Sequence, residues 1–166
     1  MTSSGSTVLY GAIPVQLKLS PVEKRALGRF GNLLCQRVGA SRPFVCLLAD
    51  DAHLRQLNLR FLGNDYPTDV LSFPAIGPSN QLGEIAISLE RAALQAAEFG
   101  HTTLDEVRIL LLHGVLHLTG LDHDNDDGRM AREEKRWRGE FGLPETLIAR
   151  ASRPSTRSVK FKKGAA

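Results

Sequence analysis

The chain has 166 residues, of which 42% are hydrophobic and 23% are charged, a size and composition typical of a single folded domain. No apolar run approaches the roughly 18 residues that a membrane-spanning helix needs, and the N-terminus lacks the basic and apolar regions of a secretory signal. Cys35 and Cys46 lie in apolar segments without metal-site or redox spacing. We therefore expect buried free thiols and a cytoplasmic protein without a membrane partner.

The net charge of +3 is distributed unevenly along the chain. Residues 150–166 carry six Lys or Arg and no acidic residue, whereas residues 1–149 hold 15 basic and 18 acidic residues. The sequence therefore predicts a folded domain over 1–149 and a basic tail without fixed structure over 150–166. Such a tail either binds polyanions through counterion release or only adds solubility, and both interpretations stay open.

The N-terminal half predicts two strands and two helices in alternation. Alternating apolar residues predict a strand with one buried face over 12–20. A helix follows over 21–38, with a capping box that begins at Ser20. A more buried strand over 42–50 then precedes a short helix over 50–63, which begins with aspartates and ends at a glycine.

The C-terminal half predicts two strands followed by three helices. Strands over 68–74 and 83–89 are joined by a turn-rich link, which indicates a hairpin. The helical segments cover 88–100, 102–120 and 127–142. This order of elements predicts a single α+β domain, with a small mixed four-stranded sheet covered by about five helices.

The helix over 102–120 is apolar nearly all round, so we expect it to lie at the centre of the domain. Thr103 and Glu106 are spaced as a capping box at its start, and Gly120 marks its end. A capping role explains Glu106 better than a catalytic one. The sequence assigns no general base.

Three of the five histidines lie at the end of this helix, in the segment HGVLHLTGLDH. His113 and His117 are four residues apart, so they point within about 40° of each other and lie about 6 Å apart along the axis. Gly120 can adopt a positive φ and turn the chain back, which would bring His123 to the same point. We therefore predict one metal ion per chain, held by the three histidines at the end of the central buried helix. Zinc is favoured, although nickel, copper or iron would accept the same nitrogens.

Two other kinds of metal site share this spacing. Metzincin peptidases carry HExxHxxGxxH, but their glutamate base would stand at position 114, where this chain has Gly114. Glycine cannot transfer a proton, so a peptidase is a distant alternative. A structural zinc would need a fourth protein ligand, for which Asp122, Asp124 and His53 are candidates.

The segment HGVLHLTGLDH resembles the signature HGxLHLxGxDH of the YbeY family, which are bacterial metal-dependent endoribonucleases. Residues 57–74 and 82–100 resemble two further blocks of that family in the same order, and the resemblance spans about residues 45–142. It implies an α+β fold with four strands and zinc at the three histidines. It also implies cleavage of single-stranded RNA in 3′ end maturation of small-subunit rRNA and in ribosome quality control.

The partners implied by this resemblance are rRNA and the ribosome or its proteins, with no DNA. The chain departs from the family at one position, because the family usually has an arginine where Leu62 stands. Arg60 lies two residues earlier, about 200° away around a helix. This difference keeps a non-catalytic, zinc-containing ribosome-associated module open as the main alternative. Ser72 and Thr68 are candidates for phosphate contacts, although packing explains them slightly better.

Overall fold

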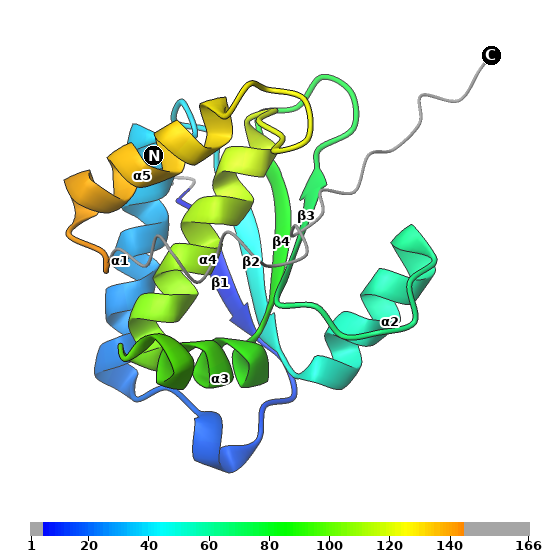
Figure 1. Cartoon of the computed structure of the whole chain (residues 1–166), viewed down its shortest axis with the longest axis vertical. Coiled ribbons are helices and arrows are strands. Elements are labelled where there is room, and N and C mark those ends of the chain that lie inside the picture. The colour runs from blue at the N-terminus through cyan, green and yellow to red at the C-terminus, as the bar shows by residue number, and fades with distance from the viewer. Residues whose placement is uncertain (1–4, 145–166) are drawn as a thin grey trace.

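Four strands form one mixed sheet in the order β1-β2-β4-β3 (Figure 1). The strands β1 (Thr7–Tyr10), β2 (Phe44–Ala49) and β4 (Gly83–Ser88) run parallel, and β3 (Val70–Pro74) pairs antiparallel with β4 at one edge. The computed structural model describes residues 5–144, so the prediction for the tail over 150–166 lies outside the described residues. The mixed four-stranded sheet is as predicted.

Five helices accompany the sheet within the described residues: α1 (Pro21–Arg37), α2 (Asp51–Leu62), α3 (Leu89–Phe99), α4 (Thr103–Leu118) and α5 (Arg129–Phe141). The helices α1 and α4 pack on one face, and α2 covers part of the other (Figure 1). The α+β fold class and the number of helices are therefore confirmed. In the described part of the chain, no helix combines the length and apolar character that crossing a membrane requires.

Most of the predicted helix boundaries are confirmed by their capping groups. Ser20 and Glu23 form the predicted capping box of α1, each side chain accepting from the other's backbone N–H. The carboxylate of Asp50 caps α2, which ends at Gly63 with a φ of +73°.

The strands β3 and β4 form the predicted hairpin.

The prediction of a strand over residues 12–20 is wrong. The first strand is β1, and the segment after it contains only a short 3-10 helix, Val15–Leu17. Pro14 has no N–H to donate to a neighbouring strand, and Val15 is exposed. Leu19 is buried, so the apolar residues of this segment anchor a loop to the core rather than alternate across a sheet.

The prediction of a capping box at Thr103 and Glu106 is also wrong. Thr102 caps α4, where its hydroxyl accepts a hydrogen bond from the Asp105 N–H at 3.1 Å. Glu106 is fully buried instead, with its carboxylate 2.5 Å from Nε2 of His101. The cap therefore lies one residue earlier than predicted, and the side chain of Glu106 packs inside the domain.

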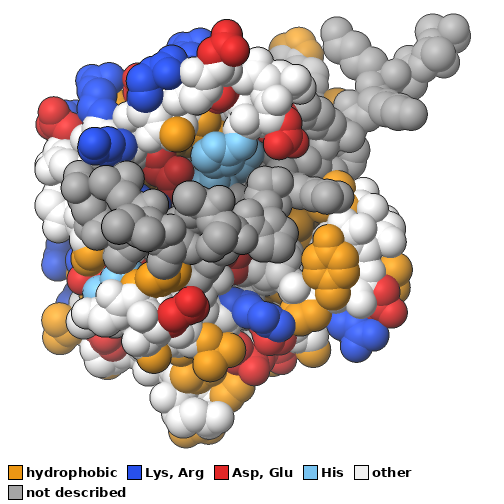
Figure 2. All heavy atoms as spheres, in the orientation of Figure 1, with side chains coloured by type: hydrophobic (Ala, Val, Ile, Leu, Met, Phe, Trp, Pro, Cys, Tyr) orange, Lys and Arg blue, Asp and Glu red, His pale blue; other side chains and the backbone are white. Residues whose placement is uncertain are grey.

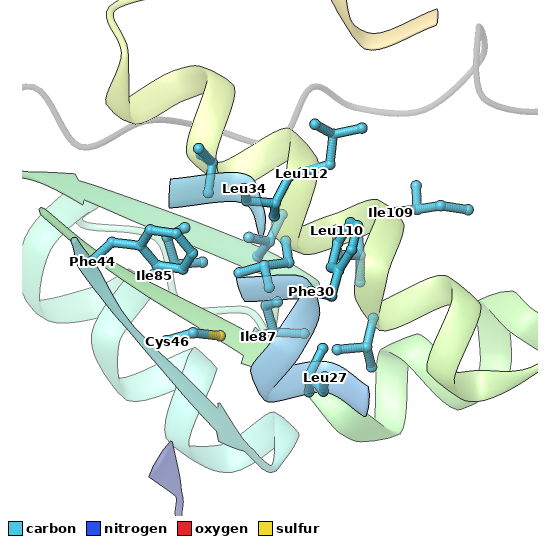
Figure 3. Close-up of a cluster of buried hydrophobic side chains, with 14 of the residues drawn as sticks. Leu27, Phe30, Leu34, Phe44, Cys46, Ile85, Ile87, Ile109, Leu110 and Leu112 are labelled. Carbon is cyan, nitrogen blue, oxygen red and sulfur yellow. The ribbon is translucent and has the colours of Figure 1, made fainter. Parts of the chain in front are cut away.

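The helix α4 lies at the centre of the domain, as predicted. Its residues from 106 to 118 are buried, apart from the half-buried Arg108. Figure 3 shows side chains of α1, the strands and α4 in one apolar cluster, among them Leu27, Phe30, Leu34, Phe44, Cys46, Ile85, Ile87, Ile109, Leu110 and Leu112. Because removing apolar surface from water stabilises by about 25 cal/mol per Å², this packing holds α4 and its histidines in place.

Candidate metal centre

The three predicted histidines converge at the C-terminal end of α4. His113 and His117 are buried, at 8% and 4% exposure, while His123 lies in the following loop and is the least buried of the three. The chain turns back at Gly120, whose φ of +99° is the positive value expected from the sequence. One nitrogen from each histidine lies within 4.8 Å of the other two. Histidine atoms reach the surface near the end of α4 in Figure 2.

Hydrogen bonds orient the two buried imidazoles so that their Nε2 atoms face each other. Nδ1 of His117 lies 3.0 Å from the carbonyl oxygen of Leu121. Because a carbonyl only accepts, this Nδ1 carries the proton and Nε2 of the neutral ring keeps its lone pair. Nδ1 of His113 lies 3.2 Å from the carboxylate of Glu134. The two Nε2 atoms are 3.1 Å apart, a separation that suits two ligands of one metal with bonds of about 2.0–2.1 Å.

The electrostatics of the cluster also suit a metal. Burial, together with the nearby His113 and His123, lowers the pKa of His117 from 6.5 to about 4. His117 is therefore neutral at pH 7, which is the form that binds a metal. Burial would raise the pKa of Glu134, but the adjacent His113 and Arg138 outweigh it and bring that pKa to about 2. His117 is thus neutral, and the ionised carboxylate of Glu134 lies against the neighbouring His113.

The number of protein donors matches a metal site with an open coordination position. Within residues 5–144, the three histidines form the one group of His, Cys, Asp or Glu that is placed to hold a metal ion. None of the candidate fourth ligands, Asp122, Asp124 and His53, belongs to this converging group in the described part of the chain. The geometry therefore favours three protein ligands, as in catalytic zinc sites, over a closed structural site.

Gly114 lies where a metzincin peptidase would carry its glutamate base, and it faces the sheet. A Cβ at this position would lie 3.0 Å from two atoms of Ile85 and 3.2 Å from Oγ of Ser72. Ser72 is buried and donates a hydrogen bond to the Gly114 carbonyl at 3.1 Å, so it packs β3 against α4. Even a Cβ would be tightly packed here, and the chain has no carboxylate where the peptidase base would stand, so the site lacks the general base of a metzincin.

Glu134 and Arg138 belong to this site, although the sequence pattern did not single them out. They lie on the buried face of α5, one turn apart, and Nη2 of Arg138 donates to Oε1 of Glu134 at 3.0 Å. The same oxygen is the one near His113. The sequence did contain an indication of this role, because Glu134 and Arg138 lie among the apolar positions of an amphipathic helix.

Comparison with known proteins gives the family. The sequence profile described as Endoribonuclease YbeY matches residues 35–142. The chain belongs to the YbeY family. The Endoribonuclease YbeY of Solibacter usitatus is 51% identical over 146 residues, which cover 88% of this chain and 95% of the relative. That of Koribacter versatilis is 41% identical over 151 residues, which cover 91% and 99%.

The fold agrees with this assignment to the YbeY family. The solution structure of TM1509 from Thermotoga maritima matches with a TM-score of 0.52 and 26% identity, covering 82% of this chain and 91% of the other. The resemblance to the YbeY family seen in the sequence is confirmed by the profile and by the two relatives.

Leu62, where the resemblance to the family predicts an arginine, is the last residue of α2. The helix α2 continues through Leu62, which packs in an apolar cluster between α2 and the sheet. Arg60 lies inside this helix and is exposed, with its guanidinium 5.4 Å from the centre of the Phe61 ring. Arg60 and Leu62 lie two residues apart on this continuous helix, so their side chains point to different sides of it.

Proposed function

We propose that this YbeY-family chain is a zinc-dependent endoribonuclease that cleaves single-stranded RNA, with one zinc held by His113, His117 and His123. The observation that carries the proposal is the convergence of three imidazole nitrogens within 4.8 Å at a site that reaches the surface. Family membership supplies the class of reaction. Nitrogen donors in this number favour zinc over the hard cations, which prefer oxygen.

The chemistry divides between the metal and the chain. Zinc held by His113, His117 and His123 would supply a Lewis acid for an RNA phosphate or for an attacking water, which suits phosphodiester cleavage at neutral pH. The chain holds the donors in place: the Leu121 carbonyl orients His117, and the carboxylate of Glu134 lies against His113. The RNA phosphate would approach from the side of His123, the least buried of the three.

The substrate within this proposal is the precursor of small-subunit rRNA, cut during maturation of its 3′ end in the cytoplasm. The protein would also act in ribosome quality control, with the ribosome or its proteins as partners and without DNA as a substrate. The support for this step is the similarity to YbeY relatives over nearly their whole length.

The second candidate is a zinc-containing, ribosome-associated module without catalysis. The observation that favours it is Leu62, which puts an apolar side chain where the family usually has an arginine. If an arginine at this position is needed to neutralise the RNA phosphate, the chain would bind zinc and RNA without cutting.

The first experiment is the metal content of the purified full-length chain and of its His113→Ala variant, measured by elemental mass spectrometry. About one zinc per wild-type chain and a loss in the variant are expected. A single-stranded RNA cleavage assay follows, with His117→Ala as the control, since a contaminating nuclease would survive that substitution. Cleavage by the wild type alone supports the enzyme. Zinc without cleavage favours the non-catalytic module, and no zinc after resupply refutes both.

A further inference from the structure

A charged pair lies on the face of α5 that packs into the domain. The side chains of Glu134 and Arg138 are only 13% and 9% exposed, and they share this face with Met130 and Trp137, which are buried. Replacing a buried ion pair with apolar residues is often neutral or stabilising, because both charges must leave water. Stability alone therefore gives little reason for this pair, and its contacts indicate another role.

The pair is connected to the metal centre through one oxygen atom. Oε1 of Glu134 accepts from Nη2 of Arg138 at 3.0 Å and lies 3.2 Å from Nδ1 of His113. An ionised carboxylate only accepts, so this contact favours a proton on Nδ1 of His113. In the other neutral tautomer, the lone pair of Nδ1 would face the carboxylate.

The tautomer of His113 decides whether the ring can bind a metal. With the proton on Nδ1, Nε2 of His113 keeps its lone pair and points toward Nε2 of His117, 3.1 Å away. The Leu121 carbonyl has the same effect on His117. Two lone pairs at this distance repel each other unless a cation lies between them.

We infer that Glu134 is a positioning residue of the metal centre, which orients His113 and holds it in the tautomer that exposes Nε2. Arg138 fixes the carboxylate in turn. The inference rests on the proposed metal site, since Glu134 acts through His113 and is not itself one of the predicted ligands. It also links α5 to the metal, because the helix brings both side chains to His113 from another part of the fold.

The test is the zinc dissociation constant of the full-length chain, measured by competition with a chelator. Glu134→Ala is expected to weaken zinc binding by about 10–100-fold, the usual effect of removing a carboxylate that supports a histidine ligand. Glu134→Gln is expected to recover most of that loss, because its amide oxygen still accepts from Nδ1. Arg138→Met is expected to cause a smaller loss than Glu134→Ala.

A matched control lies one residue away on the same helix. Glu133→Gln removes an equal charge from a residue that pairs with Arg136 at 3.5 Å, so its zinc affinity should equal that of the wild type. Urea unfolding of each metal-free variant, followed by circular dichroism, separates a loss of fold from a loss of affinity. Should Glu134→Ala fail to fold, Glu134→Leu decides, because leucine keeps the bulk of the side chain and accepts no hydrogen bond from Nδ1: a loss of zinc affinity of about 10-fold or more supports the inference, and an unchanged constant overturns it.

The outcomes distinguish this inference from the proposed function. Tight zinc binding by the wild type and equally tight binding by Glu134→Ala would overturn the positioning role alone. A wild-type chain that binds no zinc would overturn the metal site and the positioning role together.

Discussion

Replacing Gly114 by alanine measures how closely α4 approaches the sheet. At an open position inside a helix, this substitution stabilises by about 1 kcal/mol, because glycine loses more backbone entropy on folding. At position 114 the new Cβ would lie 3.0 Å from Cδ1 and Cγ2 of Ile85 and 3.2 Å from Oγ of Ser72. Ile85 is 1% exposed and surrounded by the core, so it has little space into which to move.

The free-energy cost of packing an extra methyl group at position 114 should exceed the stabilisation from the higher helix propensity of alanine. Inserting a methyl group into a well-packed core costs about 1–3 kcal/mol. A shift of α4 away from the sheet would also strain the hydrogen bond from Ser72 to the Gly114 carbonyl, which contributes about 0.5–1.5 kcal/mol. After subtracting about 1 kcal/mol for the helix propensity of alanine, Gly114→Ala should destabilise the protein by about 0.5–3.5 kcal/mol.

The assay is urea unfolding of the metal-free protein, with Gly28→Ala as the matched control. Gly28 lies inside α1, and a Cβ there meets nothing within 4 Å. Gly28→Ala should therefore stabilise by about 0.5–1 kcal/mol, so the two substitutions should differ in sign. If Gly114→Ala stabilises the protein as much as Gly28→Ala, position 114 of α4 does not pack tightly against β3 and β4, and the reasoning is refuted.

Gly120→Ala should destabilise the metal-free protein by about 1–2 kcal/mol, because φ at this position is +99°. Since the turn at Gly120 places His123, the substitution should also weaken zinc binding in calorimetric titrations, and an unchanged zinc affinity would contradict this. Burial raises the pKa of Cys46 to about 12, so a thiol reagent at pH 8 should label it only after denaturation, and rapid labelling of the folded chain would argue against its buried position. The pKa of His117 falls from 6.5 to about 4 on folding, so the unfolded chain takes up this proton first as the pH decreases. The metal-free protein should then lose up to about 3 kcal/mol between pH 6.5 and 4 in urea titrations, and His117→Ala should reduce that loss.

The two wrong structural predictions have a common cause. Alternation of apolar residues over 12–20 looks like a strand, but a loop that reaches into the core at Leu19 produces the same pattern. Thr102 and Thr103 are equally good capping residues by their chemistry. In the structure Thr102 caps α4, while the carboxylate of Glu106 is buried against His101. In both cases the structure buries a side chain in a way that the local sequence pattern does not specify.

The positions of the metal donors follow from local sequence, because helical periodicity places His113 and His117 on one face and Gly120 permits the return to His123. The identity of the residues behind these donors does not follow in this way. Glu134 comes from α5, and its contact with His113 depends on the angle and distance at which α5 packs against α4. The need for glycine at position 114 likewise depends on Ile85 in β4 and Ser72 in β3. Periodicity describes which face of a helix is apolar, but the packing of separate elements determines which side chains meet there.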